Sequence, residues 1–89
     1  MRLFTITLAL EVVGMNIRVN SVHPGAIAPP YVSPYLEDPE SRQTVLARTL
    51  MKRSGESAEI TKVVAFLASD TSSFMTGSEV GVDGGFLST

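Results

Sequence analysis

The stretch that decides the fold runs from residue 16 to residue 25 and reads Asn16-Ile17-Arg18-Val19-Asn20-Ser21-Val22-His23-Pro24-Gly25. Residues 17–22 form a short run rich in β-branched side chains, which is typical of a β-strand. His23, Pro24 and Gly25 then stop the run, because proline cannot donate to a sheet and Pro-Gly favours a turn. The stretch therefore predicts a strand that leads directly into a turn.

Upstream of this strand, apolar residues recur at spacings of three and four along residues 3–13, which predicts a helix. One apolar stripe consists of Leu3, Ile6, Leu10 and Val13, and a second consists of Phe4, Leu8 and Val12. Two stripes leave few polar positions, so we expect the helix to pack on two sides, against a sheet and against a neighbour. We expect Gly14 to end it in the left-handed conformation.

Downstream of the turn, four prolines within residues 26–39 exclude a sheet and favour an ordered loop. Asp38 as N-cap and Pro39 in the first helical position predict a second helix that ends near Met51. After Gly55, a third helix is expected to begin with Ser57 as its cap. Its predicted buried face comprises Ile60, Val63, Val64 and Leu67. A last strand over residues 79–82 is ended by Asp83-Gly84-Gly85.

These elements follow the order helix, strand, loop with helix, helix, strand, in which helices connect two strands. Such connections imply parallel pairing and an α/β fold. Parallel sheets are normally covered on both faces and contain more than two strands. We therefore interpret residues 1–89 as a single partial domain that is incomplete on its own.

Composition narrows the classes of partner. The formal net charge of -2 provides no basic field, so we expect neither nucleic acid nor a membrane surface as partner. The chain has no cysteine and one histidine, so we expect no metal site. The first residues place a basic residue before an apolar run, as secretory signals do, but Thr5, Thr7 and Glu11 interrupt that run. We expect a cytoplasmic protein.

Four stretches of the sequence resemble one protein family. Residues 16–25 closely resemble the segment of short-chain dehydrogenases/reductases that enters the sixth strand and ends in Pro-Gly. Three further stretches match in order: residues 7–11 resemble the end of the helix bearing the active-site Tyr-x-x-x-Lys, residues 53–60 resemble the Arg-x-Gly-x-Pro-x-Glu-Ile run, and residues 66–85 resemble the C-terminal strand and its approach. The resemblance implies the C-terminal half of a Rossmann-like, doubly wound parallel sheet.

The resemblance also implies a site. Its cofactor would be NAD or NADP, and the cofactor-facing turn would comprise Pro24, Gly25, Ala26 and Ile27. The substrate loop would cover residues 26–56, with Tyr31, Tyr35 and Met51 as substrate-binding residues. Where the family usually has a threonine, this chain has Pro29, which lacks both a hydroxyl and an amide hydrogen.

The catalytic part of the family pattern is missing from these residues. Neither Tyr-x-x-x-Lys nor a glycine-rich turn occurs in the 89 residues, so we assign no catalytic residue. His23 has no partner identifiable by spacing, and Arg18, Arg53 and Glu59 are interpreted as solvated or helix-end charges.

Two functions remain open at this stage. The chain is a fragment of an NAD(P)-dependent oxidoreductase for small alcohols or carbonyls and is inactive alone. Alternatively, it is a non-catalytic interaction module that pairs through its first helix with itself or with a full-length homologue.

Overall fold

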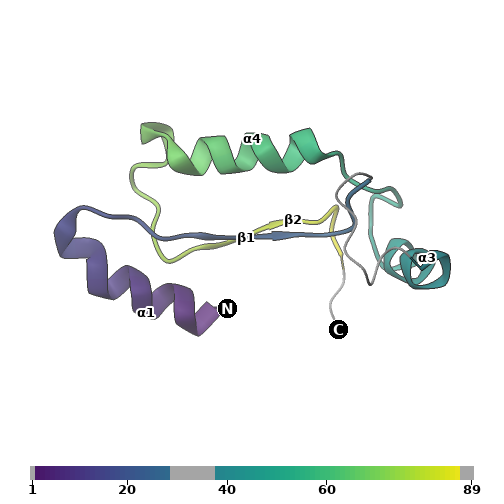
Figure 1. The fold of residues 1–89 in the computed structure, drawn as a ribbon, viewed down its shortest axis with the longest axis horizontal. Helices are drawn as coiled ribbons and strands as arrows, with labels where there is room; N and C mark the ends of the chain where they lie inside the picture. The colour runs from purple at the N-terminus through teal and green to yellow at the C-terminus, as the bar shows by residue number, and fades with distance from the viewer. Residues whose placement is uncertain (1, 29–37, 87–89) are drawn as a thin grey trace.

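Two parallel strands with a helix on either face form the centre of the molecule (Figure 1). The computed structural model describes residues 2–28 and 38–86. Its elements are helix α1 (Arg2–Val12), 3-10 helix η1 (Val13–Met15), strand β1 (Ser21–Pro24), helix α3 (Pro39–Ala47), helix α4 (Ser57–Ala68), 3-10 helix η2 (Asp70–Ser72) and strand β2 (Glu79–Val82). The pairing runs in register from Ser21 opposite Glu79 to Pro24 opposite Val82. The predicted partial α/β fold is confirmed.

The end of the first helix differs from the prediction. Gly14 lies inside η1, and Asn16 instead takes the left-handed conformation, with φ of 60°. Its N–H donates to the Val13 carbonyl at 3.1 Å. Asparagine is one of the few residues other than glycine that tolerate this conformation, so the chain turns two residues later than expected.

Strand β1 also lies later than predicted, at Ser21–Pro24 instead of residues 17–22. Residues 18–20 are bonded instead to the loop before β2, where Val19 accepts from the Gly77 amide at 2.6 Å. The Asn20 side chain accepts from the Ser78 N–H at 3.0 Å and donates to the Met75 carbonyl at 3.2 Å. Side-chain bonds of Asn20 thus join the backbone bond of Val19 along this lead-in, and the regular pairing begins only at Ser21.

Helix α3 begins as predicted and ends early. Asp38 is the N-cap, its carboxylate accepts from the Ser41 N–H at 3.3 Å, and Pro39 is the first helical residue. The helix ends at Ala47 and not near Met51. The next residues instead form hydrogen bonds to the segment after β2, so tertiary contacts override the local helical pattern.

Helix α4 has its predicted position but a different cap and a more exposed face. Its N-cap is Glu56, so Ser57 is the first helical residue and not the cap. The Glu59 carboxylate accepts from the Glu56 N–H at 2.8 Å, which satisfies one free amide of the helix start. The predicted buried face is only half-buried, and Val64 remains 49% exposed.

Arg18 connects the lead-in of β1 to the end of α4, a role that its interpretation as a solvated charge missed. Its guanidinium donates to the carbonyls of Leu67, Ser69, Ser72 and Met75 and to the Ser72 hydroxyl, at 2.8–3.2 Å. Those carbonyls lie where α4 and η2 end and have few partners within their own helices. Arg18 thus fixes α4 against the sheet.

The core of the described residues is thin. Its buried apolar residues are Ala9, Ala26 and Ile27. Helix α1 buries Thr5 and Ala9 but leaves most of both apolar stripes in solvent, so only one of its two predicted packing sides is covered here. Within the described residues, no helix is long and apolar enough to cross a membrane.

Candidate functional site

The turns that follow β1 and β2 lie against each other at the carboxyl end of the strand pair. The Gly25 N–H donates to the Val82 carbonyl at 3.1 Å. A Cβ atom at Gly25 would lie 2.8 Å from Cα of Asp83 and 2.9 Å from its Cβ. Real Cβ contacts are not this short, so only glycine allows the two turns to approach so closely.

A third segment, residues 49–55, closes this end of the sheet. Ile27 and Gly55 form a parallel bridge, in which the Gly55 N–H donates to the Ala26 carbonyl and the Ala28 N–H donates to the Gly55 carbonyl, both at 2.8 Å. On the other side, the Met51 N–H donates to the Gly84 carbonyl at 3.0 Å. The segment therefore binds the backbone of both turns.

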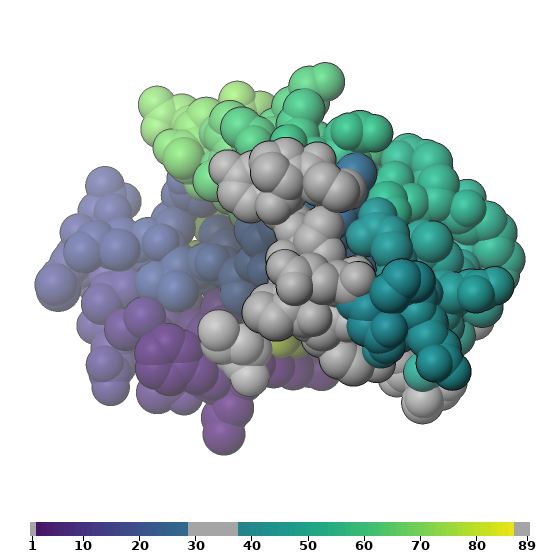
Figure 2. Space-filling view, turned by 45° about the vertical axis from the view of Figure 1, so that its right-hand side comes forward, coloured from purple at the N-terminus to yellow at the C-terminus, as the bar shows by residue number. Residues whose placement is uncertain are grey.

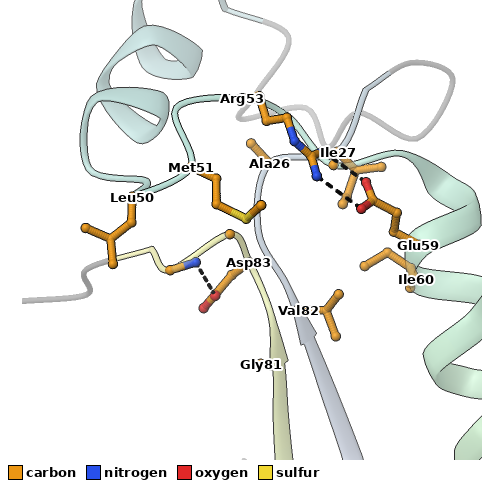
Figure 3. A pocket seen from close by; sticks show the side chains of 13 residues that line it. Ala26, Ile27, Leu50, Met51, Arg53, Glu59, Ile60, Gly81, Val82 and Asp83 are labelled. Atoms are coloured by element: carbon orange, nitrogen blue, oxygen red, sulfur yellow. Dashed lines mark hydrogen bonds and ion pairs between the residues drawn. The ribbon is translucent and has the colours of Figure 1, made fainter.

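A cavity of about 430 Å³ lies between these three segments and the start of α4 (Figure 3). It is lined by Ala26, Ile27, Leu50, Met51, Arg53, Gly55, Glu59, Ile60, Gly81, Val82, Asp83, Gly84 and Gly85. Most of these residues are apolar or contribute only backbone, and the charged ones lie at the rim of an otherwise apolar wall. Such a composition is typical of small-molecule sites.

The backbone of Ile27 supplies polar groups at this cavity. In its parallel bridge, the bonds are made by the carbonyl of Ala26 and the N–H of Ala28, so the N–H and carbonyl of Ile27 itself point away from Gly55. Neither group has a backbone hydrogen-bond partner among residues 2–28 and 38–86. Ile27 lines the cavity, so its N–H and carbonyl are candidate contacts for a ligand there.

The predicted site residues divide into three groups. Ala26, Ile27 and Met51 line the same cavity, so residues 25 positions apart meet as expected for one site. Pro24 and Gly25 line a neighbouring hollow instead, together with His23, Glu79, Gly81, Asp83 and Phe86. Tyr31 and Tyr35, like Pro29, lie outside the described residues.

Arg53 and Glu59 form a two-pronged ion pair at the rim of the cavity, with the Arg53 Nη1 and Nη2 atoms 3.0 and 3.2 Å from the two carboxylate oxygens. Hydrogen bonds from Arg53 and from the Glu56 N–H lower the pKa of Glu59 to about 2. The carboxylate is therefore ionised at neutral pH and does not serve as a proton donor there. The pair holds the segment before α4 to the first turn of that helix.

His23 does not form a catalytic relay with its neighbours. Its Nε2 atom lies 3.1 Å from the Ser21 hydroxyl and 3.3 Å from the Glu79 carboxylate. A relay needs one ring nitrogen for the nucleophile and the other for the orienting acid. Among the described residues, both partners meet the same nitrogen, so these three groups are not arranged as a relay.

The segment after β2 is a part of the site that sequence reasoning treated only as a strand end. Asp83 accepts from the Gly85 N–H at 3.0 Å, and Gly84 and Gly85 have φ of 62° and 81°. A Cβ at Gly85 would lie 2.8–3.0 Å from the Leu50 side chain. Two consecutive glycines directly after a strand were the available signal, because they mark a left-handed turn against another segment.

In α/β proteins with parallel strands, ligands bind at the carboxyl ends of the strands, where turns of this kind lie. The fold and the cavity therefore place this chain in that class of ligand-binding proteins. The profile described as "Enoyl-(Acyl carrier protein) reductase" matches residues 1–87. Cyclopentanol dehydrogenase from Comamonas testosteroni is 47% identical over 85 residues, which are 96% of this chain and 34% of that protein. The chain belongs to the short-chain dehydrogenase/reductase family.

Solved structures agree with this assignment. The TT0495 protein from Thermus thermophilus is 36% identical, with a TM-score of 0.86 over 99% of this chain and 37% of that one. The structure of 4-hydroxyisoleucine dehydrogenase complexed with NADH is 28% identical, with a TM-score of 0.82 over 99% of this chain and 36% of that one. The chain thus spans about a third of the length of the relatives that it matches.

Proposed function

We propose that this chain supplies the nicotinamide-side wall of an NAD(P)-dependent oxidoreductase for small alcohols or carbonyls. The observation that carries the proposal is that the N–H and carbonyl of Ile27, at the carboxyl end of the sheet, have no backbone partner within residues 2–28 and 38–86. A nicotinamide carboxamide has one carbonyl acceptor and one NH₂ donor, so it complements this pair. When bound, the nicotinamide would supply the hydride chemistry.

The remaining wall residues suit the same ligand. Apolar side chains of Met51, Ile60 and Val82 surround the cavity and would exclude water from a flat ring. Met51 is the substrate-side residue of this proposal within the described part, and Tyr31 and Tyr35 are proposed to join it. Related proteins include one complexed with NADH and one with bound NADP, which supports the cofactor class without deciding between the two.

Catalysis would require groups that these residues do not contain. The 89 residues include no Tyr-x-x-x-Lys and no glycine-rich turn, and His23 forms no relay. Positioning a cofactor contributes to a rate only when a proton donor is held beside the reacting carbonyl. We therefore propose that the 89-residue polypeptide alone is inactive and that its function depends on the other two thirds of the family fold.

A chimera tests this function. In it, the 89 residues replace the matching segment of Comamonas testosteroni cyclopentanol dehydrogenase. We expect NAD- or NADP-dependent oxidation of cyclopentanol within about a hundredfold of the host rate, since a misplacement of about 1 Å can cost that much.

Replacing Ile27 with proline in the chimera removes the N–H of Ile27, which has no backbone partner among the described residues. We expect this variant to raise KM for the cofactor about tenfold.

The matched control for this substitution is Ile27→Leu, which keeps the backbone N–H and changes only the side-chain shape. We expect it to leave KM for the cofactor close to that of the chimera. Equal KM values for the two variants would show that the Ile27 N–H does not bind the cofactor. Turnover by the isolated, mass-verified 89-residue chain would contradict the proposed dependence on the rest of the fold.

The second candidate function is association through α1, favoured by its exposed apolar surface. Leu3, Phe4 and Leu10 are 78%, 66% and 71% exposed. Solvated apolar surface of this kind marks an interface, and the partner would be a second copy or a full-length homologue. Sedimentation velocity at micromolar concentration is expected to show a dimer that Phe4→Glu dissociates and Thr7→Glu, at an exposed polar position of the same helix, does not. A wild-type chain that stays monomeric at micromolar concentration would remove the main support for this candidate function.

A further inference from the structure

Helix α3 lies apart from the strand pair, at one end of the molecule (Figure 1). None of its residues is buried. In the space-filling view, the teal atoms of this helix lie at the surface on the right-hand side (Figure 2). The helix holds the segment that follows it through hydrogen bonds between Val45 and Thr49 and between Arg42 and Ser54, and further contacts come from outside the helix.

Those contacts converge on Phe86, four residues after the end of β2. The Arg48 guanidinium carbon lies 5.2 Å from the centre of the Phe86 ring, within the range of a cation–π interaction. Thr49 forms an isolated antiparallel bridge with Phe86, and its buried hydroxyl donates to the Val45 carbonyl at 2.8 Å. Phe86 is thus joined to both residues that directly follow α3.

The neighbouring glycines extend the same contact to the cavity wall. The N–H groups of Leu50 and Met51 donate to the carbonyls of Gly85 and Gly84, at 3.4 and 3.0 Å. A Cβ at Gly84 would lie 3.0 Å from the Thr49 methyl group and 3.5 Å from Met51 Cβ. This close packing makes the position of Met51 follow the position of the segment after β2.

Met51 is the residue through which this arrangement reaches the proposed site. Figure 3 shows its side chain on one side of the cavity, with Ile27 and Ile60 on the other. Phe86 itself does not line this cavity; it lines the neighbouring hollow. An effect of Phe86 on a ligand in the cavity can therefore pass through the 48–51 segment, and also through Gly84 and Gly85, which precede it in the chain and line the cavity.

We propose that Phe86 is a positioning residue: by holding Arg48 and Thr49, it fixes Met51 as the cavity wall facing Ile27 and so sets the affinity for the nicotinamide group. The claim about affinity rests on the proposed function. The claim about the wall does not, because it concerns only how the 48–51 segment is held. The two claims can therefore fail separately.

Hydrogen–deuterium exchange of the full chain tests the wall. Phe86→Ala is expected to speed exchange of the Leu50 and Met51 amides by about tenfold, because local opening no longer has to break the ring contact. Phe86→Tyr keeps the aromatic ring and should exchange like the wild type. Phe74→Ala is the matched control, since Phe74 is fully exposed. The Ala28 and Gly55 amides, bonded at the other wall, serve as internal references that should not change.

Titration with nicotinamide mononucleotide tests the consequence for affinity. We expect Phe86→Ala to weaken binding by about threefold or more, and Phe86→Tyr and Phe74→Ala to bind like the wild type. Unchanged exchange at Met51 in Phe86→Ala, or unprotected Leu50 and Met51 amides in the wild type, would overturn the positioning role. Faster exchange with unchanged affinity would overturn the link to the ligand. These titrations use the chimera, which supplies the rest of the family fold; if the chimera with the wild-type 89 residues does not bind the mononucleotide, the affinity claim fails together with the proposed function, while the exchange data still decide how the wall is held.

Discussion

Replacing Arg18 with alanine in the chimera is expected to lower the free energy of unfolding by about 3 kcal/mol, because hydrogen bonds from a charged group are worth more than neutral ones and every bond from this guanidinium is lost. The guanidinium serves four carbonyls and one hydroxyl at the ends of α4 and η2. Its removal therefore frees the end of α4 from the lead-in of β1. Urea unfolding followed by circular dichroism measures the change.

Two further substitutions separate this role from charge alone. Arg18→Lys keeps the positive charge but lacks the planar fork, so we expect it to recover only a small part of the loss. Arg53→Ala removes an arginine whose ion pair with Glu59 is largely exposed to solvent, and we expect it to lower the free energy of unfolding much less. If Arg18→Ala and Arg53→Ala lowered stability equally, the clamp by Arg18 would be wrong.

Replacing Gly25 with alanine is the second substitution with a large expected effect. The added methyl group would lie 2.8 Å from the Asp83 Cα, a backbone atom that cannot move away as a flexible side chain would. We expect the two turns to separate at a cost of about 3 kcal/mol in unfolding free energy, at the upper end for inserting a single methyl group. Because Ile27 follows in the same turn, KM for the cofactor should rise as well.

Gly14→Ala provides the matched control, because nothing lies within 4 Å of a Cβ at Gly14 and its φ lies outside the left-handed region. We expect this variant to be stabilised by about 0.5 kcal/mol, since alanine restricts the unfolded chain. The same chemical change should thus have opposite signs at the two positions. Similar unfolding free energies for the two variants would contradict the close approach of the turns.

The parts of the fold that local chemistry determines could be predicted from the sequence. Strand β2 lies at the predicted residues, and α3 begins at Pro39 with Asp38 as its cap. Both depend on near neighbours: β-branched residues before two glycines, and a carboxylate beside the free amides of a helix start. Each of these signals comes from residues only a few positions apart in the sequence.

The parts that differ depend on residues far apart in the sequence. Helix α3 ends early because Thr49 forms a bridge with Phe86. Strand β1 begins late because the Asn20 side chain donates a hydrogen bond to the Met75 carbonyl in the segment before β2. Arg18 was misjudged for the same reason, since its acceptors lie 49 to 57 residues away. No periodicity or cap reports such contacts.

The candidate site shows the same division. The family resemblance indicated Ala26, Ile27 and Met51, and the structure brings all three to one cavity. The glycine turn after β2 was not recognised as part of that cavity, because its role depends on the approach of residues 49–51. The resemblance also indicated a cofactor contact at Ile27, but the bridge with Gly55, 28 positions away, which turns its N–H and carbonyl away from that segment, is seen only in the structure.

The most direct test of the central claim is the exchange rate of the Ile27 amide in the chimera, measured at single-residue resolution with and without NADH or NADPH. We expect this amide to exchange freely without cofactor and to become protected when cofactor binds, because its N–H then gains a partner. The Ala28 and Gly55 amides already have partners and should change little. An Ile27 amide that exchanges at the same rate in the free and cofactor-saturated protein would contradict the proposed nicotinamide wall.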